Sequence, residues 1–80
     1  MSTRLILTFS TLHQVLAAEK SLRSADQASF NVRPTPTPPG LGAAICGMSI
    51  EILDQDQKEK VLQFLRGKQL PPTGVHLVSN

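Results

Sequence analysis

The sequence predicts an α+β fold in which two helices pack on one face of a four-stranded antiparallel sheet. Two observations carry this prediction: short apolar segments alternate with amphipathic ones, and their order is strand, helix, strand, strand, helix, strand. At 80 residues, the chain has room for a single domain over residues 1–80. Its core must be mostly aliphatic, because Phe9, Phe30 and Phe64 are the only Phe, Tyr or Trp residues.

The first strand is expected over residues 4–9, since Leu5 to Phe9 is largely apolar on both faces, as in a central strand. Thr11 followed by Gln14 has the form of a capping box, so a helix is expected over residues 12–24. Helical spacing predicts an inward face made of Leu12, Val15, Leu16, Ala18 and Leu22.

A second strand is expected over residues 28–33, at a sheet edge, because apolar and polar residues alternate there. Prolines 34, 36, 38 and 39 then fix φ and remove backbone donors, which predicts an extended surface loop over residues 34–45. The remaining elements are expected as a strand over 46–53, a helix over 55–66 and a short strand over 74–78.

This order is that of ferredoxin-like domains, in which the first and third strands are central. Those two strands are the most apolar in this sequence, and the alternating or short ones fall at the edges. The sequence therefore predicts a ferredoxin-like two-layer sandwich.

Charge and composition limit the classes of partner. The net charge is +2, no run of Lys or Arg occurs, and few aromatic side chains are present for base stacking, so neither nucleic acid nor a membrane is an expected partner. One cysteine cannot form an internal disulfide, and no signal-like segment opens the chain. A cytoplasmic location is the expectation.

Cys46 stands at the end of the proline loop, and no charged residue occurs between Arg33 and Glu51. Two interpretations remain open. If the third strand already includes residue 46, the even-numbered side chains face the core and the cysteine is a small buried hydrophobe. If the strand begins at Gly47 or later, the thiol is outside the core.

The predicted topology brings the segments around Ser10, Thr11, His13 and Cys46 to one end of the sheet. There the amides at the start of the first helix, with His13, would stabilise a Cys46 thiolate, which is the form that attacks sulfur. Gly47 would leave space beside the thiol. A thiol hydrolase is disfavoured because no third residue orients His13, and no metal is expected because one cysteine and two distant histidines match no ligand spacing.

Several short motifs occur in a fixed order along most of the chain. They are Phe9-Ser10-Thr11 with His13, Ala-Ala-Glu-Lys at residues 17–20, Pro36-Thr37-Pro38, and Cys46-Gly47. In this order and spacing they resemble the Putative Se/S carrier protein-like family. The sequence departs from the family pattern in two places. Pro39 stands where family members commonly have an arginine after the Pro-Thr-Pro segment, and residues 42–45 stand where small hydroxyl residues are more usual.

The resemblance implies a sulfur or selenium carrier in which Cys46 holds the atom as a persulfide or selenosulfide, with His13 as thiolate stabiliser. Ser10, Thr11, Pro36, Thr37, Pro38 and Gly47 would then form the partner-facing site. The implied partners are a cysteine desulfurase-like donor and an acceptor protein. No cofactor is implied, and the protein would carry the atom rather than act as an enzyme. Pairing of the second strand with another copy would give a homodimer. The alternative is a non-catalytic module that binds a protein or small ligand and has a structural cysteine.

Overall fold

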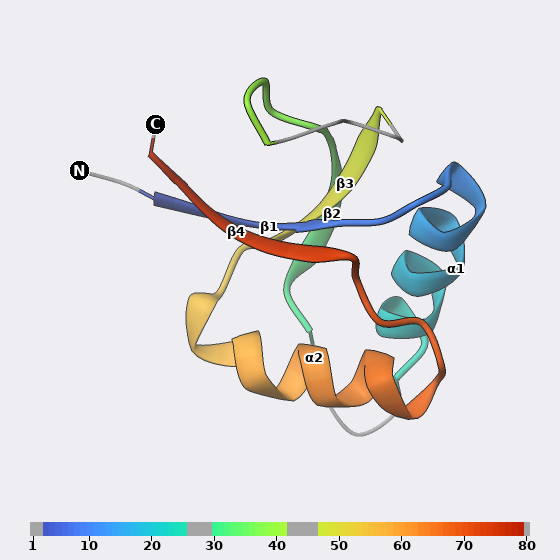
Figure 1. Cartoon of the computed structure of the whole chain (residues 1–80). Coiled ribbons are helices and arrows are strands. Elements are labelled where there is room, and N and C mark those ends of the chain that lie inside the picture. Colours follow the sequence, from blue (N-terminus) through green and yellow to red (C-terminus); the bar gives the residue numbers. More distant parts are fainter. Residues whose placement is uncertain (1–2, 26–29, 42–46, 80) are drawn as a thin grey trace.

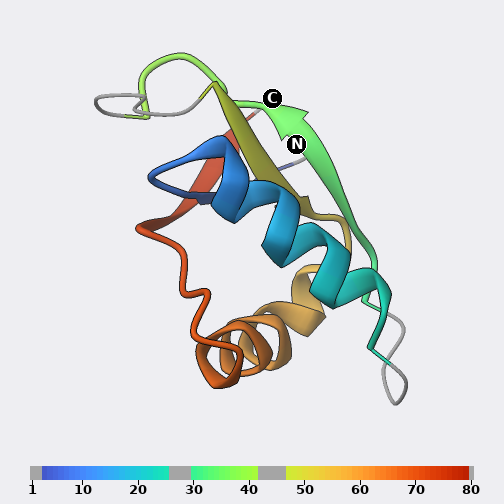
Figure 2. The ribbon, with the colours of Figure 1, turned by 90° about the vertical axis from the view of Figure 1, so that its right-hand side faces the viewer.

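The computed structural model of the protein describes residues 3–25, 30–41 and 47–79. Four strands form one antiparallel sheet in the order β2-β3-β1-β4, and both helices pack on the same side of it (Figures 1 and 2). This confirms the predicted two-layer α+β, ferredoxin-like arrangement. The elements are β1 (Thr3–Thr8), α1 (Leu12–Arg23), β2 (Val32–Pro36), β3 (Met48–Ile52), the 3-10 turn η1 (Gln55–Gln57), α2 (Lys58–Gly67) and β4 (Gly74–Ser79).

The core lies between the helices and the two central strands, β1 and β3. Leu5 is opposite Ile52 and Leu7 is opposite Ile50, so these four side chains point toward the helices together. Apolar residues of α1 and α2 cover them. The buried core consists of Leu5, Leu7, Phe9, Val15, Ala18, Leu22, Ile50, Ile52, Val61 and Leu65.

Side-chain caps fix where the helical segments begin. Thr11 Oγ1 accepts a hydrogen bond from the Gln14 amide at 3.1 Å at the start of α1, as the sequence predicts. The predicted helix over 55–66 is divided: Asp54 caps η1, and α2 follows and ends at Gly67. The left-handed residue after α2 is Gln69, with φ of 59°. Neither described helix is long and apolar enough to cross a membrane.

The second strand lies further along the chain than predicted. β2 runs from Val32 to Pro36 and therefore includes two prolines that the sequence analysis assigns to a loop. The bonds from Leu53 N to Asn31 O and from Thr37 N to Gly47 O share one register, so the odd-numbered residues of β2 face β3. Pro34 and Pro36 point their nitrogens away from β3, and a strand at the sheet edge loses no ladder bond to them.

The inward face of α1 is also narrower than predicted. Val15, Ala18 and Leu22 are buried, whereas Leu12 and Leu16 are 51% and 54% exposed. Spacing alone allows a stripe through all five positions. The position of the helix over the sheet buries the row formed by Val15, Ala18 and Leu22. Leu12 and Leu16 lie to the side of this row, where they are exposed.

Two leucine substitutions in the same helix test this difference. We expect Leu22→Ala to lower the free energy of unfolding by about 2–5 kcal/mol, because it opens a cavity in the core. Leu16→Ala should change it by no more than about 0.5 kcal/mol, because the side chain is largely in solvent. Urea unfolding followed by circular dichroism measures both. Equal losses for the two variants would contradict the burial of Leu22 and the exposure of Leu16.

Candidate functional site

Four strand ends lie at one end of the sheet. The last residue of β1, Thr8, is opposite Ser49 near the start of β3 and opposite Gly74 at the start of β4. Ser49 is in turn opposite Thr35, near the end of β2. Because α1 starts four residues after Thr8, its first turn and the β2–β3 connection lie toward the same end of the molecule (Figure 2).

The β2–β3 connection has a well-defined base. Thr37 donates its amide to the Gly47 carbonyl at 2.9 Å, and its hydroxyl lies 2.6 Å from the hydroxyl of Ser49. Ser49 is fully buried, whereas Pro38 is half-buried and Pro36 is exposed at the end of β2. These bonds place Thr37 and Gly47 at the last rung of the ladder, where the connection leaves the sheet.

Gly47 is exposed, and a Cβ at this position would meet no atom within 4 Å. β3 begins at Met48, so Gly47 lies just before the strand. Cys46 itself lies outside the described residues, and so does Gly42. Gly40 has φ of 88° in the turn after β2, a conformation that favours glycine.

Two amides near the start of α1 already have hydrogen-bond partners. The Ser10 amide donates to Gln14 Oε1 at 3.1 Å, and the Gln14 amide donates to Thr11 Oγ1. Both are therefore occupied. Among the described contacts, the amides of Leu12 and His13 remain as the first-turn donors that helix geometry directs outward.

The two histidines differ in their surroundings. His13 is exposed on the first turn of α1, and no hydrogen bond to its ring occurs among the described residues. His76 is half-buried, and its Nε2 lies 3.3 Å from Thr8 Oγ1. Within residues 3–25, 30–41 and 47–79, no three His, Cys, Asp or Glu side chains gather as metal ligands would.

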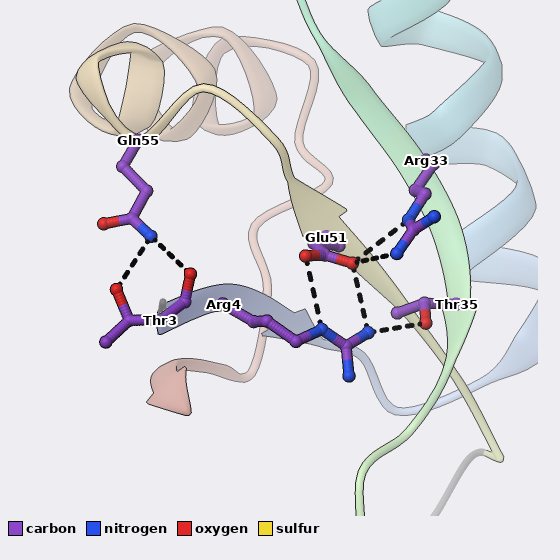
Figure 3. Close-up of polar contacts among 6 residues, drawn as sticks. All are labelled: Thr3, Arg4, Arg33, Thr35, Glu51 and Gln55. Carbon is purple, nitrogen blue, oxygen red and sulfur yellow. Dashed lines mark hydrogen bonds and ion pairs between the residues drawn. The ribbon is translucent and has the colours of Figure 1, made fainter. Parts of the chain in front are cut away.

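A charged cluster lies on the sheet face that the helices leave open (Figure 3). Arg4 donates to both oxygens of Glu51, at 3.3 and 3.1 Å, and Arg33 donates to Glu51 Oε1 at 3.1 and 3.0 Å. Arg4 also donates to the buried Thr35 hydroxyl at 3.0 Å. One carboxylate thus links all three strands β1, β3 and β2.

The arginines change the acidity of the carboxyl group. Hydrogen bonding from Arg4, with help from Arg33, holds the pKa of Glu51 below its ordinary value despite burial, which acts in the opposite direction. The cluster was not predicted from the sequence. The available signal was opposite charge on strands expected to be neighbours: Arg4 on the first and Arg33 on the second, with Glu51 on the third. The bonds of the cluster join β1, β2 and β3 to one another.

Comparison with protein families identifies the family to which the chain belongs. The model of the family described as Putative Se/S carrier protein-like matches residues 4–77, from β1 to β4. The chain belongs to this family. Its sequence resemblance is thereby confirmed, and the matched range contains every residue of the predicted site, Cys46 included. Searches of curated proteins and of solved structures gave no match.

The lowered pKa of Glu51 predicts how stability depends on pH. Because the folded pKa lies below the unfolded one, the stabilisation is fully present above about pH 4.3 and is lost as the pH falls through the folded pKa. We expect Glu51→Gln to be less stable than the wild type at about pH 7, with a difference that shrinks below about pH 4. Urea unfolding of both proteins across this range measures it.

Glu59→Gln is the matched control, because Glu59 is exposed on α2 and forms no ion pair within residues 3–25, 30–41 and 47–79. Its difference from the wild type should be small at every pH. A Glu51→Gln difference that stays constant from neutral to acid pH would show that the ion pairs contribute nothing to folding.

Proposed function

We propose that this protein carries sulfur or selenium, and that Cys46 holds the transferred atom as a persulfide or selenosulfide. The observation that carries the proposal is membership of the Putative Se/S carrier protein-like family over residues 4–77. Cys46 is the only cysteine in the chain, so a carrier that uses a thiol must use this one. A thiol of this kind needs a reducing compartment, which favours the cytoplasm.

The geometry around the β2–β3 connection supports the same proposal. Cys46 directly precedes Gly47 in the sequence, and Gly47 is exposed at the last rung of the β2–β3 ladder. The first turn of α1 lies toward the same end of the sheet. A rigid base beside an exposed glycine suits a group that has to meet two other proteins in turn.

The chemistry of loading is a thiol exchange. The Cys46 thiolate attacks the outer sulfur of a persulfide on the donor, a cysteine desulfurase-like protein. A bond forms between Cys46 Sγ and that sulfur while the S–S bond of the donor breaks, and its electron pair leaves on the donor cysteine as a thiolate. No net oxidation occurs. The acceptor protein takes the atom by the same exchange in reverse.

The start of α1 supplies the groups proposed to favour the thiolate. The outward amides of Leu12 and His13 and the positive end of the helix dipole favour an anion, and the exposed His13 ring adds a donor. Ser10 and Thr11 act indirectly, by fixing the first turn through their bonds with Gln14. Pro36, Thr37 and Pro38 hold the partner-facing connection at its base.

Intact mass spectrometry tests the loading step. After incubation with a cysteine desulfurase and cysteine, the wild type should gain the mass of one sulfur atom, and a reducing agent should remove it. Cys46→Ser should gain nothing while unfolding at the same urea concentration as the wild type. The proposal would be falsified if the wild type stayed unmodified, or if Cys46→Ser gained the same mass. The first result would favour a binding module with a structural cysteine.

Alkylation tests the role of His13. We expect the rate of reaction of Cys46 with iodoacetamide to rise with a midpoint at least about one pH unit below the free-thiol pKa of about 8.5. His13→Gln should move this midpoint upward. His76→Gln is the matched control, because its ring hydrogen-bonds Thr8 instead, and it should leave the midpoint in place. Equal shifts for the two variants would exclude a specific role for His13.

A further inference from the structure

The two edges of the sheet differ in their capacity to pair with another strand. On β2 the outward-facing backbone positions are Val32, Pro34 and Pro36, so only Val32 has an amide to donate. Prolines at such positions protect an edge from pairing. The homodimer suggested by the sequence, through the second strand, is therefore poorly supported by the arrangement of β2.

The opposite edge, β4, lacks this protection. The backbone hydrogen-bonding groups of the odd-numbered residues of β3 face β2, so those of its even-numbered residues face β1. The registers then direct the backbone groups of the odd-numbered residues of β1 to β3. They direct those of the even-numbered residues of β4 to β1. The amides and carbonyls of Val75, Leu77 and Ser79 therefore point outward. β4 contains no proline and no Asp, Glu, Lys or Arg, and among the described residues no strand pairs with its outer side.

The side chains of the same residues are apolar and exposed. Val75 is 40% and Leu77 is 64% exposed, on the face that carries the helices. With Leu5, Gln55 and Lys58 they line a shallow hollow of about 240 Å³. β4 thus combines an unprotected backbone edge with exposed apolar side chains. Unpaired amides and carbonyls at a strand edge are best satisfied by another extended strand.

The opposite face of β4 leaves the edge clear. His76 Nε2 lies 3.3 Å from Thr8 Oγ1 and 2.6 Å from the point where a Cβ on Gly74 would stand. The ring therefore lies back over Gly74 toward β1, away from the outer side of β4. A side chain at residue 74 would require the His76 ring and the Thr8 hydroxyl to shift.

We propose that two copies of this protein pair through β4 in antiparallel orientation about a two-fold axis at Leu77. In this register Leu77 is opposite its counterpart, and Val75 is opposite Ser79 of the second copy. All three outward-facing residues then exchange backbone hydrogen bonds, and the most exposed leucine is covered. No formal charges of like sign meet along the strand. The two sheets become one eight-stranded sheet, and the β2–β3 connections stay accessible at its far edges.

Sedimentation equilibrium between about 1 µM and 1 mM tests the pairing. The wild type should change from 8.7 kDa to twice that mass as concentration rises. Leu77→Lys should raise the dissociation constant of the dimer at least about tenfold, because it places a charge at the two-fold axis. Leu16→Lys is the matched control, since Leu16 is an exposed leucine on α1, and it should dimerise as the wild type does.

Disulfide trapping tests the register independently of these variants. In a Cys46→Ser background, Leu77→Cys should form an intermolecular disulfide readily under mild oxidation, because directly opposite Cα atoms lie about 5.5 Å apart. Val75→Cys, on the same strand, should cross-link much more slowly, since the two copies of residue 75 stand far apart in this register. A wild type that stays monomeric throughout, Leu77→Lys dimers as tight as the wild type, or faster trapping at residue 75 would each overturn the proposal.

Discussion

The structure depends on one carboxylate in the middle of its sheet. Glu51 is 6% exposed on the central strand β3, where burial of a lone charge would be costly. Arg4 from β1 and Arg33 from β2 supply hydrogen bonds to it, and the same Arg4 reaches Thr35 on β2. The aliphatic core joins the sheet to the helices on one face, whereas this cluster joins the strands to each other on the other face, where no helix packs.

β2 depends on this cluster more than the other strands do. It pairs with β3 alone, since its outer side pairs with no other strand among the described residues, and two of its five residues are prolines. Additional bonds hold both of its ends. Asn31 accepts from the Leu53 amide and donates to Gln57 Oε1, each at 2.8 Å, and Thr37 bonds Gly47 and Ser49. These contacts fix β2 up to the rung where the connection to Cys46 begins.

Much of the fold could be predicted because local patterns and topology agree. The apolar character of Leu5–Leu7 and Ile50 placed β1 and β3 at the centre, and Thr11 marked the start of α1. The bounds of β2 could not be predicted in this way, because whether a proline nitrogen faces a neighbouring strand or solvent depends on register. The Glu51 cluster depends on strand pairing for the same reason. For the site, the motifs identified the family, but the occupied amide of Ser10 could be seen only in three dimensions.

The prolines at positions 34, 36, 38 and 39 have two separate effects on the chain around the site. Within β2 they remove outward donors, so the edge nearest the site does not recruit another strand. Beyond Thr37 they restrict φ in the segment that leads toward Cys46. Both effects suit the carrier function proposed above, since backbone pairing there would compete with brief contacts between the site and a partner. In the proposed dimer, pairing with a second copy uses β4, at the opposite edge of the sheet from β2 and the connection that follows it.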